Sequence, residues 1–352
     1  MRNIAANYLV EAIVAVVESA FWSEAMRRRQ FLLICGAAGL LPSAALSQPA
    51  AKKPALIAYL SGGTKASRVP LIASFLQGMK DLGWTDGGSF SMEARYAEGA
   101  FDRIPDLARE LLALNPDIFV ISTTPANLAA KPLITEKPIV IVGVADPIAV
   151  GLVKSLSRPG GNITGVTNII AELTGKRLEI LKELVPNASK VAVFINPNDQ
   201  NAALQMQNAT DAAKRLGIEL QPVLSVTSAG DVEPAFEAAV RAGAAAALRM
   251  LDPVETALRS LTIAMAAKYR LPTVYGFRET VEMGGLIAYG PNLPDQYRQA
   301  ASFVDKVLKG KLPADLPVER PVTFELVVNL KTAKALGIEV PPTILAQAAV
   351  VD

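Results

Sequence analysis

What the sequence lacks narrows its chemistry before any motif is considered. The 352 residues contain no histidine and a single cysteine, Cys35, which lies in the amino-terminal apolar run. Catalysis by histidine or by a cysteine thiolate is therefore excluded, as are ordinary His/Cys zinc sites and an intramolecular disulfide. Carboxylates or lysines could act in principle, but no pattern indicates that they do. We therefore expect no enzyme activity, no metal site and no cofactor.

Charged residues are also scarce, at 19% of the chain, and the 35 basic and 33 acidic residues leave a net charge of +2. No dense Lys/Arg run follows Arg29, so we expect no nucleic-acid partner. Apolar residues make up 51%, and the 24 glycines and 24 prolines are spread along the chain. This composition and length predict folded α/β material sufficient for two domains.

The amino-terminal segment has the layout of an export signal. Three arginines precede a short apolar run, and small residues at Ala45 and Ser47 suit a cleavage site. The run is too short to span a bilayer. We predict a targeting region over 1–47, with Met26 as the true start and a signal peptide at 26–47, exported by the general secretory or the twin-arginine route. The mature protein would then lie in the periplasm.

Short apolar runs alternate with amphipathic helical patterns through the rest of the chain. Runs of this kind, rich in β-branched residues and bounded by turn residues, are typical of buried strands. We predict strands at 55–60, 89–96, 117–122, 139–144, 190–195, 220–226, 245–251, 272–275 and 286–289, with helices that include 102–114, 172–184 and 292–308. The 89–96 run alternates apolar and polar residues, which favours an edge strand. The order predicts doubly wound α/β construction.

The stretch from Gly143 to Asn168 contains a strand end, an acidic loop and a Gly-Gly turn before a second strand. Asp146 follows the end of a predicted parallel strand, where open α/β sheets bind ligands. Pro147 suits the first position of a helix. Asp146 is therefore either a ligand contact beside a helix amino terminus or a simple helix cap.

Part of this stretch recurs later at a constant spacing. Gly160-Gly161-Asn162-Ile163 matches Gly284-Gly285-Leu286-Ile287, and Asn168 matches Asn292. The ordered matches predict two similar lobes. Each Gly-Gly turn leads into the last strand of a lobe, so the segments that come after these strands are natural crossovers, and 317–330 would make a third.

We therefore predict an α/β fold of two doubly wound, Rossmann-like lobes joined by a multi-strand hinge. The first lobe would comprise 55–166 plus 292–318, and the second 167–291 plus 319–352. Lobes joined by several short connections close on a ligand by hinge motion.

Three long motifs match a known family: Asp146-Pro147 with Gly151 to Leu156 and Arg158 to Gly165, Gly284-Gly285-Leu286 with Tyr289-Gly290-Pro291, and Phe324 to Gly337. They resemble the ABC-transporter substrate-binding proteins that include tryptophan-binding members. The resemblance implies the type I periplasmic-binding fold, capture of a small solute, and delivery to an inner-membrane ABC permease with a separate ATPase subunit. The chain has no P-loop pattern, consistent with a separate ATPase. We expect a monomer.

Residues at strand ends are the candidate ligand contacts. An amino acid needs N–H and hydroxyl donors for its carboxylate and an acidic group for its ammonium. Hydroxyl groups, side-chain amides and the backbone N–H of glycines could donate to the carboxylate. An aspartate could accept from the ammonium group, and tyrosines could form an apolar wall. The predicted set is Ser61, Gly62, Thr123, Thr124, Asp146, Asn196, Asp252, Tyr275 and Tyr289. Each aromatic could equally be a core residue, and each hydroxyl a helix cap.

The leading hypothesis is a periplasmic solute-binding component of an importer for an amino acid or related carboxylate. A sensor subunit that presents its ligand to a membrane receptor is an alternative. A secreted enzyme that uses carboxylates would need a catalytic pair that no pattern supplies. A transcriptional regulator with the same core would need a DNA-binding helix pair where this chain has a predicted signal.

Overall fold

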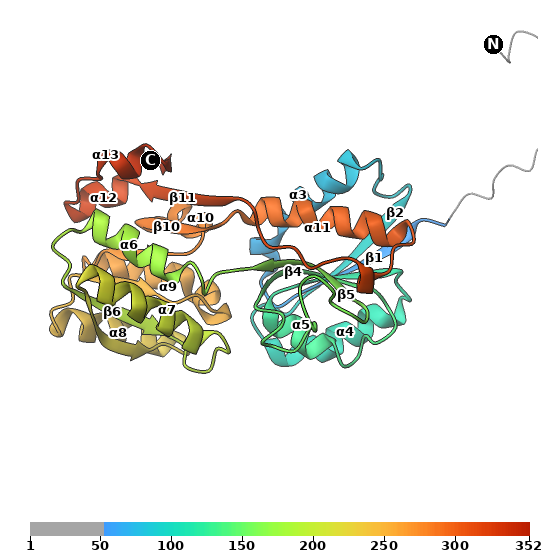
Figure 1. Ribbon diagram of the computed structural model, residues 1–352, viewed down its shortest axis with the longest axis horizontal. Helices are drawn as coiled ribbons and strands as arrows, with labels where there is room; N and C mark the ends of the chain where they lie inside the picture. Colours follow the sequence, from blue (N-terminus) through green and yellow to red (C-terminus); the bar gives the residue numbers. More distant parts are fainter. Residues whose placement is uncertain (1–52) are drawn as a thin grey trace, which may run out of the picture. The chain divides into compact units, whose positions relative to one another are not determined.

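The computed structural model describes residues 53–352, and the predicted targeting region lies outside them. Helices and strands alternate around two separate sheets (Figure 1), which confirms the predicted α/β fold with two lobes. We refer to the lobe built on the five-stranded sheet as lobe 1 and to that built on the seven-stranded sheet as lobe 2.

The sheet of lobe 1 is parallel throughout, in the order β2-β1-β3-β4-β5. Its strands are β1 (Ala55–Ser61), β2 (Phe90–Tyr96), β3 (Ile118–Ser122), β4 (Ile139–Ala145) and β5 (Ile163–Asn168), and its helices are α3 (Lys65–Asp81), η1 (Phe101–Arg103), α4 (Ile104–Ala113) and α5 (Thr124–Ala130). β2 lies at an edge, as its alternating pattern predicts. β4 is buried almost throughout, as expected of a parallel strand covered on both faces.

The sheet of lobe 2 has the order β12-β11-β10-β9-β8-β6-β7, and only the β10–β11 pair is antiparallel. Its strands are β6 (Lys190–Ile195), β7 (Glu219–Ser225), β8 (Ala246–Arg249), β9 (Thr273–Tyr275), β10 (Ile287–Pro291), β11 (Phe324–Asn329) and β12 (Ala348–Val351). Its helices are α6 (Thr174–Leu184), α7 (Ala202–Leu216), α8 (Ala229–Arg241), α9 (Pro253–Lys268), α10 (Arg278–Glu282), α12 (Leu330–Leu336) and α13 (Pro342–Leu345).

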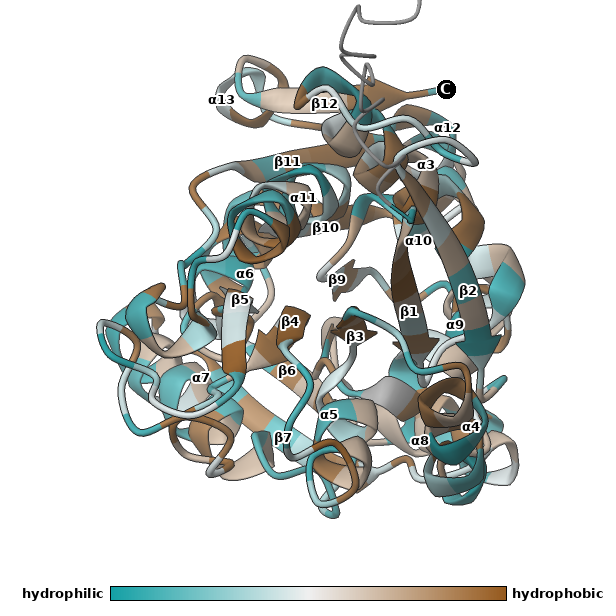
Figure 2. Cartoon of the chain, turned by 90° about the vertical axis from the view of Figure 1, so that its right-hand side faces the viewer, coloured by the Kyte–Doolittle hydropathy of each residue, from teal (hydrophilic) through white to brown (hydrophobic). Residues whose placement is uncertain are grey.

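Helix α11 (Leu293–Leu308) follows β10 of lobe 2 but packs in lobe 1. Tyr297 and Phe303 of α11 share a buried cluster with Ile57 of β1 and Phe75 of α3, and Figure 1 shows α11 beside α3. The chain then passes η2 (Pro313–Asp315) and returns to lobe 2 as β11. Figure 2 shows the hydrophobic colouring of β1, β3 and β4, whose side chains supply much of the lobe 1 core. In the described part of the chain, no helix is long and apolar enough to cross a membrane.

The segment after β4 differs from the expectation. Pro147 does not begin a helix: the N–H groups of Leu152 and Val153 both donate to its carbonyl, and the chain forms turns up to β5. Gly151 adopts the left-handed conformation, with φ +69°, which ends the first turn before a helical repeat can form. Asp146 therefore lies before a turn and has no helix amino terminus beside it.

Candidate functional site

Most of the predicted site residues lie at the carboxyl edges of the two sheets. Ser61 ends β1, Thr123 follows β3 and Asp146 follows β4, while Asn196 follows β6 and Asp252 lies three residues beyond β8. Within each parallel sheet these strand ends share one edge, which is where ligands of such sheets bind.

A chain of hydroxyl groups crosses the interior of lobe 1 to reach this edge. The hydroxyl oxygens of Tyr297 and Tyr59 lie 2.8 Å apart, and that of Tyr59 lies 3.0 Å from Ser122 Oγ. Ser122 Oγ donates to Ser61 Oγ over 2.8 Å, and the Gly63 N–H donates to the same oxygen over 3.1 Å. Each hydroxyl has one proton, so Tyr297 donates to Tyr59 and Tyr59 to Ser122. Ser61, fully buried, thus fixes the loop after β1.

Arg68 at the start of α3 completes this group and was not found from the sequence. A Cβ on Gly63 would lie 2.5 Å from Arg68 Nε, so the guanidinium folds closely over the glycine loop. Burial lowers the pKa of Arg68, but the nearby hydroxyls of Tyr297 and Tyr59 more than offset this effect. Arg68 Nε has no hydrogen-bond partner within residues 53–352. Lobe 1 therefore holds a cation with unused hydrogen-bonding capacity beside Ser61.

Thr123 combines an unpaired hydroxyl with an unusual backbone. Its φ of 77° and ψ of 145° lie in a region that glycine adopts far more readily than a β-branched residue. Its Oγ1 is buried and has no hydrogen-bond partner among the described residues. A Cβ on Gly62 would lie 2.8 Å from this oxygen, so only glycine fits there without a shift. The neighbouring Thr124 Oγ1 accepts the N–H of Ala145 over 3.2 Å and so ties the start of α5 to the end of β4.

Asp146 makes the contact expected of a cap. Its Oδ1 accepts the N–H of Ala149 over 3.0 Å, and its φ is +36°. The residue also lines a cavity of about 80 Å³ together with Asn168 and Arg320. The capping contact is observed, while a ligand contact stays a prediction.

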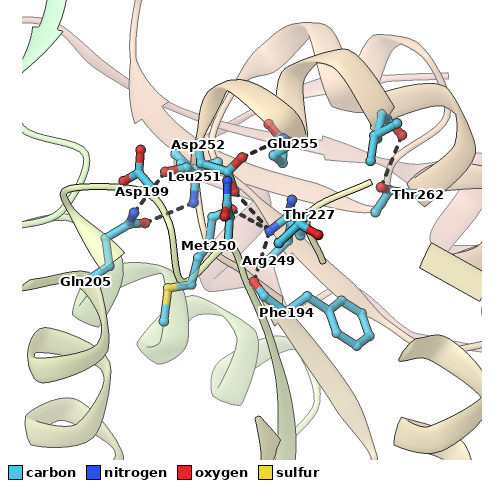
Figure 3. A network of polar contacts seen from close by, with 12 residues as sticks. Phe194, Asp199, Gln205, Thr227, Arg249, Met250, Leu251, Asp252, Glu255 and Thr262 are labelled. Carbon is cyan, nitrogen blue, oxygen red and sulfur yellow. Dashed lines mark hydrogen bonds and ion pairs between the residues drawn. The ribbon is translucent and has the colours of Figure 1, made fainter. Parts of the chain in front are cut away.

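Asp252 in lobe 2 also makes contacts within the protein (Figure 3). Its Oδ1 accepts the N–H of Glu255 over 2.9 Å and caps α9, and its Oδ2 lies 3.2 Å from Nη1 of the buried Arg249. The same Nη1 donates to the carbonyls of Phe194 and Met250 over 3.0 and 3.1 Å. Arg249 Nε and Nη2 have no partner in the described part of the chain. Asp252 Oδ2 makes this ion pair but no hydrogen bond within residues 53–352, so an ammonium group would compete with Arg249 for it.

The loop that carries Asp252 is held from α7. Gln205 donates through Nε2 to the carbonyl of Leu251 over 2.8 Å and accepts the N–H of the same residue over 2.9 Å (Figure 3). Asn196 accepts the N–H of Asn198 over 3.0 Å and shapes the turn after β6. Burial raises the pKa of Asp199, which lies in that turn. These contacts position the edge of lobe 2 independently of any ligand.

Three further charged residues are buried at this edge, none of which was predicted. Glu255 and Arg259 lie in the first turns of α9, and Arg177 lies in the first turn of α6. Both Glu255 oxygens, Arg177 Nε and Nη1, and Arg259 Nε have no hydrogen-bond partner within 53–352. Burial raises the pKa of Glu255 against the opposing effect of the nearby arginines. Burial lowers the pKa of Arg177 to about 9.

A sequence signal existed for two of the lobe 2 residues. Arg249 interrupts an otherwise apolar strand, and Glu255 stands three residues after Asp252 in the spacing of a capping box. Arg68, Arg177 and Arg259 have no such signal, because their burial depends on tertiary packing.

The two predicted tyrosines have packing contacts. Tyr275 is 1% exposed and its ring runs toward Gly285, where an added Cβ would lie 3.0 Å from its Cε2. Gly285 precedes β10, so the Tyr275 ring extends toward the amino end of that strand. Tyr289 stacks on Phe324 with ring centroids 6.5 Å apart. Ligand roles for both tyrosines remain predictions. The described residues contain no group of three or more His, Cys, Asp or Glu side chains placed to hold a metal ion.

A family model and several known proteins are similar to this chain. A family model described as "ABC transporter substrate binding protein" matches residues 61–352. The chain is 26% identical over 266 residues to a tyrosine-binding protein of Clostridioides difficile (strain R20291), a match that covers 75% of this chain and 76% of that protein.

Two solved structures cover 85% of this chain and 100% of their own. One is a conserved domain protein from Vibrio cholerae, with 27% identity and a TM-score of 0.78. The other, from Streptococcus pneumonia, is an ABC domain in complex with L-Trp, with 24% identity and a TM-score of 0.77. The likeness to the second shows the fold alone, which is that of the type I periplasmic binding proteins.

Proposed function

The chain belongs to the ABC transporter substrate-binding protein family, and from that premise we propose that it captures an amino acid between its two lobes and delivers it to a membrane permease. A separate ATPase subunit would drive the transport. The protein would act as a monomer in the periplasm after export through the predicted signal at 26–47.

The observation that carries the amino-acid assignment is the cluster of buried acidic and basic side chains at the carboxyl edge of lobe 2, several of whose polar atoms have no hydrogen-bond partner within residues 53–352. Unused N–H groups of Arg177, Arg249 and Arg259 suit a carboxylate, and the unpaired Glu255 oxygens suit an ammonium group. A buried polar group without a partner is costly, so an arrangement of this kind favours a ligand that completes it. A zwitterion supplies both partners, whereas a sugar supplies neither charge.

These atoms are enclosed, so binding requires side chains at the edge to turn toward the ligand. Lobe 1 would contribute Arg68 and the Thr123 hydroxyl from the opposite side. We propose that the boundaries near 166, 292 and 318 act as the hinge connections and that closure brings the two edges together. The tyrosine-binding relative and the neighbour with L-Trp support an aromatic amino acid as the first class to test.

Thermal-shift screening of the purified protein tests the proposal. A ligand that binds only the folded state stabilises it, and the rise in melting temperature grows with the logarithm of ligand concentration above Kd. We expect a rise with one or more amino acids, tyrosine and tryptophan first, and none with sugars. A rise with a sugar alone would overturn the ligand assignment, and turnover of a bound compound would overturn the binding-protein assignment.

A further inference from the structure

Lobe 2 contains a second pocket, at the edge of its sheet opposite Asp252. Its volume is about 260 Å³. Thr273, which begins β9, and Leu286, which precedes β10, place it at the amino edge of the parallel strands. The walls are apolar side chains of α9 and α12 together with the Gly-Gly turn: Ile263, Ala266, Ala335, Leu336, Gly284 and Gly285.

The Gly-Gly motif explains why the pocket is open. At the matching turn of lobe 1, the Asn162 side chain donates to the carbonyls of Ile134 and Lys137 over 2.8 and 2.7 Å and fastens the turn to the preceding loop. Leu286 stands at the matching position of lobe 2 and cannot make such bonds. Gly284 and Gly285 contribute no side chains that would fill the space.

One wall of the pocket carries a hydroxyl group that can form a further hydrogen bond. Tyr275 lines the pocket, is 1% exposed, and extends its ring over Gly285. Its hydroxyl makes no hydrogen bond of normal geometry within residues 53–352, and the Thr273 side chain is the polar group nearby. The neighbouring Thr273 hydroxyl donates to the carbonyl of Leu271 over 3.0 Å. A polar atom on a bound molecule would satisfy Tyr275.

The mouth of the pocket carries two cations. Arg270 and Lys331 both line it, both are exposed, and neither forms an ion pair or a side-chain hydrogen bond within the described part of the chain. Arg270 has a φ of +50° just after α9, a position where glycine is the usual residue. The positive charge at this rim is therefore not neutralised by the protein itself.

We infer that this pocket binds a small organic anion with an apolar ring, such as an aromatic carboxylate, at a site separate from the cleft between the lobes. A cavity of roughly 150 Å³ holds benzene, so the space found here accommodates a ring with a carboxylate. The ring lies between α9 and α12, the carboxylate meets Arg270 and Lys331, and a polar atom at the far side of the ring reaches the Tyr275 hydroxyl.

Fluorine NMR with 4-fluorobenzoate tests this site directly, with the uncharged 4-fluorobenzamide as the matched probe. We expect 4-fluorobenzoate to bind with a Kd on the order of 1 mM, as small fragments do. The benzamide should bind at least about fivefold more weakly, because it loses the charge interaction at the rim.

Substitutions in and away from the pocket show where the probe binds. Ala335→Trp fills the pocket from an exposed position and should abolish binding, and Lys331→Glu should weaken it roughly fivefold. Lys311→Glu, a charge reversal at an exposed lysine of lobe 1, should have no effect. Absence of binding to the wild type or unchanged binding to Ala335→Trp would overturn the inference.

Discussion

At the scale of single residues, Thr123 brings strain and an unpaired hydroxyl to the ligand edge of lobe 1. We predict that Thr123→Gly leaves the unfolding free energy unchanged or raises it by about 1 kcal/mol, because relief of a strain of that order offsets the added chain entropy. The same change should weaken amino-acid binding about tenfold, the usual effect of losing a hydrogen bond to a charged group. Urea denaturation and calorimetric titration measure the two effects separately.

Thr124→Gly provides the control for this substitution. Thr124 lies next in the chain, but its hydroxyl is already bonded to Ala145. We expect it to lower stability and to change affinity little. If Thr123→Gly binds the ligand as tightly as the wild type, Thr123 has no ligand contact and its strain serves local packing only.

The buried Glu255 is expected to make the stability of the folded protein depend on pH. Burial raises its folded-state pKa above the ordinary 4.5, so the folded protein holds this proton more tightly than the unfolded chain. The resulting stabilisation is fully present below the ordinary pKa and is lost as the pH rises through the folded-state pKa. Relative to Glu255→Gln, the wild type should therefore gain stability when the pH falls from about 7.5 to about 5.

Thermal denaturation across this pH range measures the difference, and the exposed Glu339→Gln serves as the control. Burial also raises the pKa values of Glu279 and Asp199, which add a trend of the same sign to all variants. Parallel pH profiles for the wild type and Glu255→Gln would show that Glu255 does not titrate differently in the folded state.

At the scale of elements, the start of α9 depends on Asp252 in two ways. Asp252→Asn keeps an oxygen that can cap the helix but loses the ion pair with Arg249, and we expect it to cost about 3 kcal/mol. Asp252→Ala loses both contacts and should cost about 4 kcal/mol. Asn329→Ser keeps a capping oxygen of α12 but loses the bond to the Val281 carbonyl, while Asn329→Ala also loses the cap with the Thr332 N–H (2.8 Å) and should cost about 1 kcal/mol more.

Denaturant titration of the four variants ranks these costs. A loss for Asp252→Ala equal to the difference between Asn329→Ala and Asn329→Ser would mean that Asp252 acts only as a cap and that Arg249 is stable in the core without it. Such a result would also leave the Asp252 carboxylate available for the ligand contact predicted from the sequence.

The elements themselves were largely predictable, and one failure is informative. Aliphatic runs such as Ile139–Ala145 identify strands because they are too short for a buried helix, rich in β-branched residues and bounded by prolines. The helix expected after Pro147 does not form, because its start signal is succeeded within four residues by the left-handed Gly151. Local signals predict where an element can begin, but its length depends on the residues beyond that signal.

At the scale of the whole molecule, the fold could be predicted from the order of strands and helices, but the chemistry of the site could not. The Tyr59–Tyr297 hydroxyl contact joins residues 238 positions apart, and Gln205 holds Leu251 across 46 positions. Hydrophobic periodicity in the sequence does not reveal contacts between residues so far apart. Strand-end reasoning placed its candidate residues at the carboxyl edges of the two sheets, yet it selected Asp252, which lies beside Arg249, and missed the charged residues buried around it.

The central claim is that the two lobes capture a zwitterion. Calorimetric titration tests it most directly by comparing the amino acid that gives the largest thermal shift with its decarboxylated amine and its deaminated acid; for tryptophan these are tryptamine and indole-3-propionate. Because each analogue leaves buried charges unmatched, we predict that both bind at least about a hundredfold more weakly than the amino acid. Equal affinity for all three compounds would contradict the account.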